Sequence, residues 1–99
     1  MVIQAHHVTV GEELHEEFML ALRRGATVLH IHRYGLPHGR VELVEMHDEH
    51  AEPVPRRFIV IDSFCCHPIP LPEGNLHFIA ALPFDNHVWN FFEILDSGV

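Results

Sequence analysis

The sequence predicts a mainly β protein, a small antiparallel sandwich or open barrel of about five to seven strands. Two observations support this prediction. Six glycines and seven prolines divide the 99 residues into short uninterrupted segments, and this spacing of breaks favours strands over long helices. The segments between the breaks are rich in valine, isoleucine, phenylalanine and threonine, the residue types that strands prefer.

Six segments have the length and composition of strands. The first is rich in β-branched residues and the last is rich in aromatic residues; they are residues 2–10, 26–33, 40–47, 57–64, 75–82 and 87–95. Residues 34–39 are predicted to form a turn between the second and third of them. Residues 68–72 hold three prolines, which cannot donate ladder hydrogen bonds, so an edge or a surface loop is expected there.

Residues 12–24 allow two interpretations. Acidic residues at the start, arginines at the end and Gly25 just beyond are typical of a short helix. Leu14, Phe18, Ala21 and Leu22 would then share one face. The alternative is a loop followed by a strand from about Glu17 to Leu22 that forms a hairpin with residues 26–33. Local propensity favours the helix.

Length and charge limit the class of protein and of partner. A chain of 99 residues predicts one domain, residues 1–99, whose core is small enough for association with a second copy to stabilise it. The formal charge is −8 and only six arginines or lysines are present, so nucleic acid is not expected as a direct ligand. An acidic surface instead suits a protein partner.

The termini and cysteines predict a cytoplasmic protein. No apolar stretch is long enough to span a membrane, and the amino terminus does not resemble a signal peptide. Cys65 and Cys66 are adjacent, and a disulfide between neighbours would be strained, so both are expected to be free thiols.

Catalytic and cofactor motifs are absent from the sequence. It contains no Gly-x-Ser-x-Gly, Walker-type or Gly-x-Gly-x-x-Gly pattern. Cys65, Cys66 and His67 place a thiol beside an imidazole, but neighbours on an extended chain point to opposite faces. We therefore expect no catalytic residue, no cofactor and no enzymatic activity.

Histidines offer two candidate metal pairs. His47 and His50 could converge on an ion within a helical turn, although the acidic stretch around them also fits a polar loop. His30 and His32 would share one face of a strand while Leu29 and Ile31 face the core. The second pair fits a polar outer face, and no metal site is predicted.

The last strand carries aromatic side chains on both faces. Strand alternation places Trp89 and Phe91 on one face, and Val88, Asn90 and Phe92 on the other. A strand that is apolar on both faces needs cover on both. This predicts a homo-oligomer.

Three short motifs, in this order, resemble a family of small phage- and prophage-encoded proteins of unknown function. The motifs are Gly25-Ala26 with Val28 to Ile31; His67-Pro68-Ile69-Pro70, preceded by Arg56-Arg57-Phe58; and Val88-Trp89 with Phe91 to Glu93. The resemblance spans roughly residues 2–93. It departs where Phe64-Cys65-Cys66 replaces a Gly-Thr-Gly and where Asn90 replaces a histidine. The resemblance implies a mainly β fold, with a strand rather than a helix before Gly25, and no established activity.

The phage context implies a non-enzymatic accessory binding protein in the host cytoplasm that interferes with host defence. It would bind a host protein through its acidic surface, or sequester a small nucleotide signal between subunits. For the second mechanism, the expected ligand-binding residues are Arg33, Arg40, Arg56, Arg57, His67 and Trp89. The alternatives are a metal-dependent enzyme that uses His47, His50 and Cys66 or His67, and a structural or assembly component of a phage particle.

Overall fold

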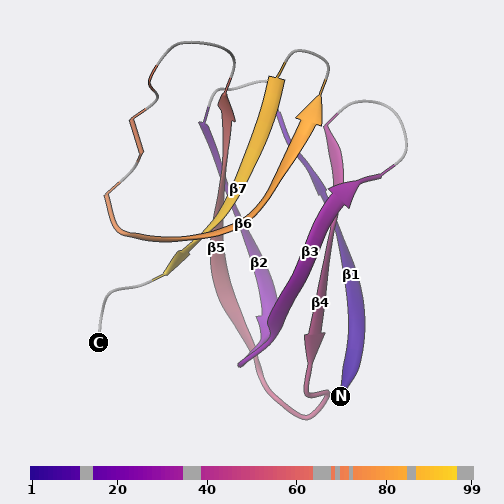
Figure 1. Ribbon diagram of the computed structural model, residues 1–99. Coiled ribbons are helices and arrows are strands. Elements are labelled where there is room, and N and C mark those ends of the chain that lie inside the picture. Colours follow the sequence, from indigo (N-terminus) through magenta and orange to yellow (C-terminus); the bar gives the residue numbers. More distant parts are fainter. Residues whose placement is uncertain are drawn as a thin grey trace.

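The protein folds into two antiparallel β-sheets in the computed structural model, which describes residues 1–11, 15–34, 39–63, 68, 70, 71, 73–84 and 87–95 (Figure 1). Sheet A has the strand order β1-β4-β3 and sheet B has the order β2-β5-β7-β6. The seven strands are β1 (Val2–Thr9), β2 (His15–Arg23), β3 (Thr27–Arg33), β4 (Arg40–His47), β5 (Pro53–Ser63), β6 (Asn75–Phe84) and β7 (His87–Leu95). No helix occurs in the described residues. The predicted all-β fold is confirmed.

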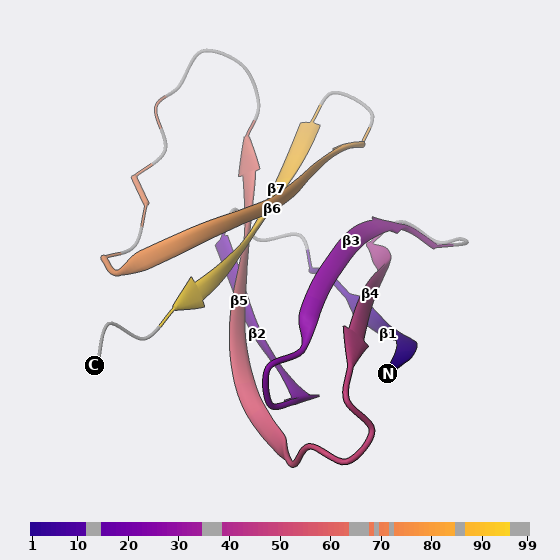
Figure 2. The ribbon, with the colours of Figure 1, turned by 60° about the horizontal axis from the view of Figure 1, so that its bottom comes forward.

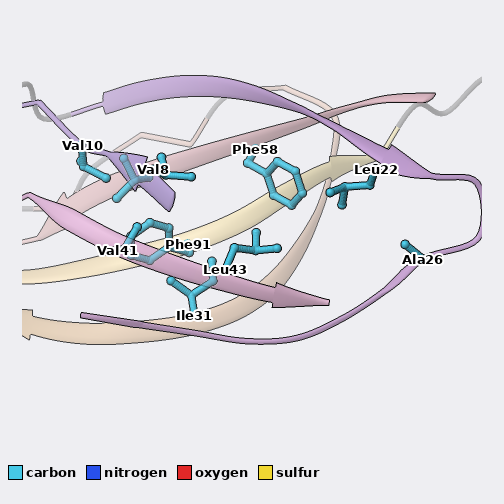
Figure 3. Close-up of a cluster of buried hydrophobic side chains, with 10 residues drawn as sticks. Val8, Val10, Leu22, Ala26, Ile31, Val41, Leu43, Phe58 and Phe91 are labelled. Atoms are coloured by element: carbon cyan, nitrogen blue, oxygen red, sulfur yellow. The ribbon is translucent and has the colours of Figure 1, made fainter. Parts of the chain in front are cut away.

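The core lies between the two sheets. Side chains from the inner faces of both sheets interdigitate there (Figure 3), and Leu43, Phe58 and Phe91 are completely buried. β4 reaches this core through every second residue, as Val41 and Leu43 illustrate. Views from two directions show sheet B on the left and sheet A on the right as separate layers (Figures 1 and 2). At one edge, β3 of sheet A lies against β6 of sheet B.

The helix considered for residues 12–24 is wrong, because His15–Arg23 is strand β2. Its inward residues Phe18, Leu20 and Leu22 recur with a period of two and join the core, and the Phe18 ring stacks on Phe58 at 5.3 Å. Packing between strands therefore overrides local helix propensity. Residues 12–14 lie outside the described part of the chain.

The hairpin expected between β2 and β3 is also wrong. β2 pairs with β5 along its whole length, whereas β3 pairs with β4 in the other sheet. The turn at Arg24 and Gly25 carries the chain from one sheet to the other, with Gly25 at a φ of 79°. Arg23 and Arg24 donate hydrogen bonds to Ala51 and Glu52 and so fix this crossing to the β4–β5 connection.

Strand β5 begins at Pro53, four residues earlier than predicted from the proline spacing. Pro53 and Pro55 pair with Arg23 and Ala21 of β2, and β7 begins to pair with β5 only at Arg57. The two prolines therefore fall where β5 has a neighbour on one side only, which a strand tolerates.

Two bulges displace side chains from simple alternation. The register shifts between Val28 and His30 on β3, and between Phe78 and Ala80 on β6. Ile31 is buried as predicted, but Leu29 is 45% exposed because it occupies the bulge. The prediction that Leu29 faces the core is therefore wrong, whereas His30 and His32 do share one face, with ring centroids 5.0 Å apart.

Candidate functional site

The outer face of sheet A carries an ordered group of imidazole, phenol, guanidinium and carboxylate side chains. Glu42 lies on the central strand β4, directly between His7 of β1 and His32 of β3 in the strand register. The Glu42 carboxylate contacts His7 Nε2 at 2.8 Å and His32 Nε2 at 3.2 Å. We call the six residues His7, His30, His32, Tyr34, Arg40 and Glu42 the histidine face.

Stacking extends this group beyond the hydrogen bonds. The Tyr34 ring stacks on His7, with centroids 4.2 Å apart and an interplanar angle of 23°, and His30 stacks on His32. The Tyr34 amide donates a hydrogen bond to the Arg40 carbonyl. A depression of about 320 Å³ is lined by Tyr34, Arg40 and residues 7–9 of β1. Glu42 is only 19% exposed and holds two more exposed imidazoles in fixed orientations.

The histidine face presents hydrogen-bonding and aromatic surface. The hydrogen bond between His7 Nε2 and the Glu42 carboxylate fixes the plane of the His7 ring. The described residues contain no group of three or more His, Cys, Asp or Glu side chains that could hold a metal ion.

A buried ion pair joins sheet B to the start of β3. Arg56 Nε and Nη2 donate to the two carboxylate oxygens of Glu93, each at 2.6 Å, and Arg56 Nη1 donates to the Ala26 carbonyl at 2.6 Å. The Arg56 side chain is 20% exposed and that of Glu93 is 8% exposed. A cavity of about 320 Å³ between β3 and β6 borders this pair, with His77 and Ile79 in its wall. Arg56 therefore ties the two sheets together.

A second buried carboxylate lies on the inner face of sheet A. Glu45 is 1% exposed and contacts His47 Nδ1 at 2.6 Å and His6 Nε2 at 3.1 Å. His50, in contrast, has an 86% exposed side chain in the turn after β4. His47 and His50 therefore lie in different environments, one buried against Glu45 and the other open to solvent.

The remaining predicted arginines lie on separate surfaces. Arg57 points away from the core and donates to Glu17 of β2 at 2.9 Å. Arg40 belongs to the histidine face, and Arg33 ends β3 opposite Val41. Within this chain, the four arginines predicted to contact phosphate do not form one cluster.

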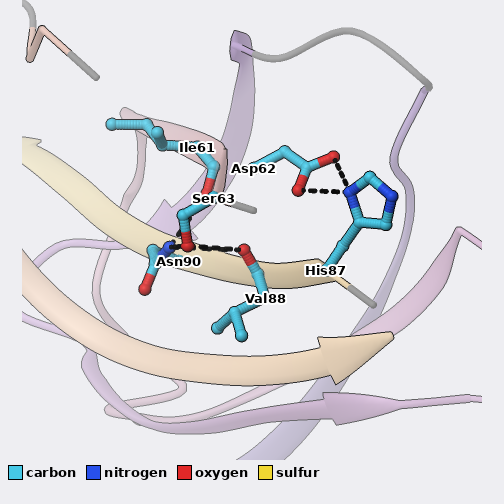
Figure 4. A network of polar contacts seen from close by, with 6 residues as sticks. All are labelled: Ile61, Asp62, Ser63, His87, Val88 and Asn90. Carbon is cyan, nitrogen blue, oxygen red and sulfur yellow. Dashed lines mark hydrogen bonds and ion pairs between the residues drawn. The ribbon is translucent and has the colours of Figure 1, made fainter. Parts of the chain in front are cut away.

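Trp89 and a polar network lie at the end of sheet B where β7 begins. His87 Nδ1 is 3.0 Å from both carboxylate oxygens of Asp62, and the Asn90 amide nitrogen lies 3.0 Å from Ser63 Oγ and 3.1 Å from the Ile61 carbonyl oxygen (Figure 4). Trp89 is half-buried and packs against the main core. The network anchors β7 to β5. His67, also predicted to bind ligand, lies outside the described residues, as do Cys65 and Cys66.

Sequence reasoning did not identify the acidic partners that organise these sites: Glu42, Glu45, Asp62 and Glu93. One signal was available, because Glu45 and His47 continue the inward alternation of Val41 and Leu43 on β4. The other pairs depend on cross-strand register, which one sequence does not specify.

Comparison with known proteins found no matching family model, no matching curated protein and no matching solved structure. In the described residues, no helix is both long and apolar enough to cross a membrane.

Proposed function

We propose that this chain is a non-enzymatic phage or prophage accessory protein that binds a host protein and interferes with host defence. The observation that carries the proposal is the histidine face. It gathers tyrosine, arginine and histidine side chains on one exposed surface, and tyrosine and arginine are the residue types that contribute most binding energy in protein interfaces. The phage context rests on the sequence resemblance described above.

Preorganisation supports binding at this face. His7 and His32 are held by Glu42, and Tyr34 is held against His7 by stacking. Side chains that are already ordered lose less conformational entropy when a partner binds. The depression between Tyr34 and Arg40 offers a recess for one side chain of the partner.

The arrangement of the arginines favours a protein partner over a small nucleotide. A nucleotide site needs several cationic groups that converge on one phosphate group. Arg56 is engaged by Glu93 and the Ala26 carbonyl, and Arg57 is engaged by Glu17 on the opposite face of the same sheet. Arg40 is therefore better placed to contact a protein surface than to share a phosphate with them.

The test is capture from host lysate with variants of the histidine face. We expect Tyr34→Ala and Arg40→Ala each to weaken capture of a specific host protein at least about tenfold, the effect of removing an interface hot spot. The matched control is Arg24→Ala, which removes an exposed arginine at the β2–β3 turn, where it pairs with exposed Glu52. The control should bind like the unmodified chain.

Native mass spectrometry of protein purified from host cells tests the alternative, a bound small nucleotide. A nucleotide-sized increment per subunit, or capture that is unchanged in both histidine-face variants, would contradict the proposal. Circular dichroism must show that both variants keep the β-sheet spectrum, so that loss of binding reports on the surface and not on unfolding.

A further inference from the structure

The outer face of sheet B is apolar where four strands lie side by side. The strand register aligns Met19, Arg57, Ile94 and Leu76 in one row across β2, β5, β7 and β6. The next row is Glu17, Ile59, Phe92 and Phe78. Ile59 and Ile94 form a second apolar cluster, against which Leu76 and Phe92 pack. This face lies on the opposite side of the molecule from the histidine face.

Part of this surface is open to solvent. Met19 is 61% exposed. Phe78 is 53% exposed, although its ring packs edge-on against Phe92 of the apolar cluster. A depression of about 240 Å³ lies beside Met19. Pro55, Ile94 and Leu95 line its apolar part, and Arg56, Arg57 and Glu93 line the rest. The face thus combines a protruding apolar side chain with an adjacent recess that is partly apolar.

The charge of this face differs from that of the whole chain. The formal charge of the protein is −8, whereas the two rows contain one acid, Glu17, and one base, Arg57, which are hydrogen-bonded to each other at 2.9 Å. A second copy can therefore approach this face without bringing unbalanced acids together. Because Glu17 and Arg57 are neighbours, a two-fold axis beside them would leave every charge opposite its complement.

We infer that the outer face of sheet B is an isologous interface, and that a second copy of this chain covers it. Met19 of one copy enters the recess beside Met19 of the other, and Glu17 and Arg57 pair across the two-fold axis. The histidine face of each copy stays exposed on the outside of the dimer.

Sedimentation velocity tests this interface. We expect the unmodified chain at micromolar concentration to sediment with twice the 11.4 kDa mass of one chain. Met19→Arg should raise the dissociation constant by about a hundredfold or more, because it buries an unpaired charge. The matched control is Ile3→Arg, which changes a 66% exposed residue of β1 in sheet A and should leave the dimer intact.

Exchanging the charges of Glu17 and Arg57 tests whether these two residues pair between copies or only within one copy. Glu17→Arg places two cations on each copy, and Arg57→Glu places two anions, so each variant alone should be monomeric. An equimolar mixture of the two should recover the dimer, since each copy then meets its complement. A monomeric unmodified chain, an assembly larger than two, or a mixture that stays monomeric would overturn the inference. These outcomes do not depend on whether the histidine face binds a host protein.

Discussion

Glu93→Leu is expected to lower the free energy of unfolding by about 3 kcal/mol, because it leaves the Arg56 guanidinium without its carboxylate between the two sheets. The values for breaking a buried pair extend to about 5 kcal/mol. The Arg56 side chain is 20% exposed and so remains partly hydrated. The expected loss of stability therefore lies at the lower end of this range. For a domain of this size, the loss corresponds to a fall of roughly 12–24 °C in melting temperature.

Urea denaturation followed by the fluorescence of Trp89, the single tryptophan, measures the loss. The matched control is Glu52→Leu, which breaks the exposed pair between Glu52 and Arg24, whose side chains are 66% and 65% exposed; that change should be within about 1 kcal/mol of the unmodified protein. All variants must be compared at one protein concentration, because the dimer inferred above would add to the apparent stability.

The double variant Arg56→Met with Glu93→Leu tests whether the unpaired guanidinium causes the loss of stability in Glu93→Leu. Removing both charges removes the unpaired cation, so most of the lost stability should return. The hydrogen bond to the Ala26 carbonyl is not restored, and recovery should therefore be incomplete. A double variant as unstable as Glu93→Leu alone would mean that the guanidinium is not the source of the loss.

The ion pair between Arg56 and Glu93 shows which part of the site could be predicted from the sequence and which part could not. Period-two alternation along β5 places Arg56 and Arg57 on opposite faces of one strand. The predicted strand began only at residue 57, so the sequence did not reveal that these two arginines lie apart. That Glu93 is the partner of Arg56 depends on how β7 aligns with β5. This alignment is set by packing across the whole sheet, and no local pattern encodes it.

Strand positions were largely predictable, whereas strand pairing was not. The predicted segments 40–47 and 87–95 coincide with β4 and β7, because each is a long β-branched or aromatic run with clear breaks. β2 was ambiguous because its composition suits a helix, and its pairing with β5 joins residues far apart in the chain. Such long-range contacts decide between two locally acceptable conformations.

Leu43→Ala is expected to lower the free energy of unfolding by about 3–5 kcal/mol, whereas Leu29→Ala should change it by less than about 1 kcal/mol. Both substitutions remove the same atoms from sheet A. Leu43 is 0% exposed at the centre of the core (Figure 3), whereas Leu29 is 45% exposed at the bulge of β3. Simple alternation places Leu29 in the core with Ile31 and predicts similar losses for both variants. Equal losses in urea denaturation would therefore contradict the bulge, and a large difference would show that the register shift between Val28 and His30 sets which leucine the core contains.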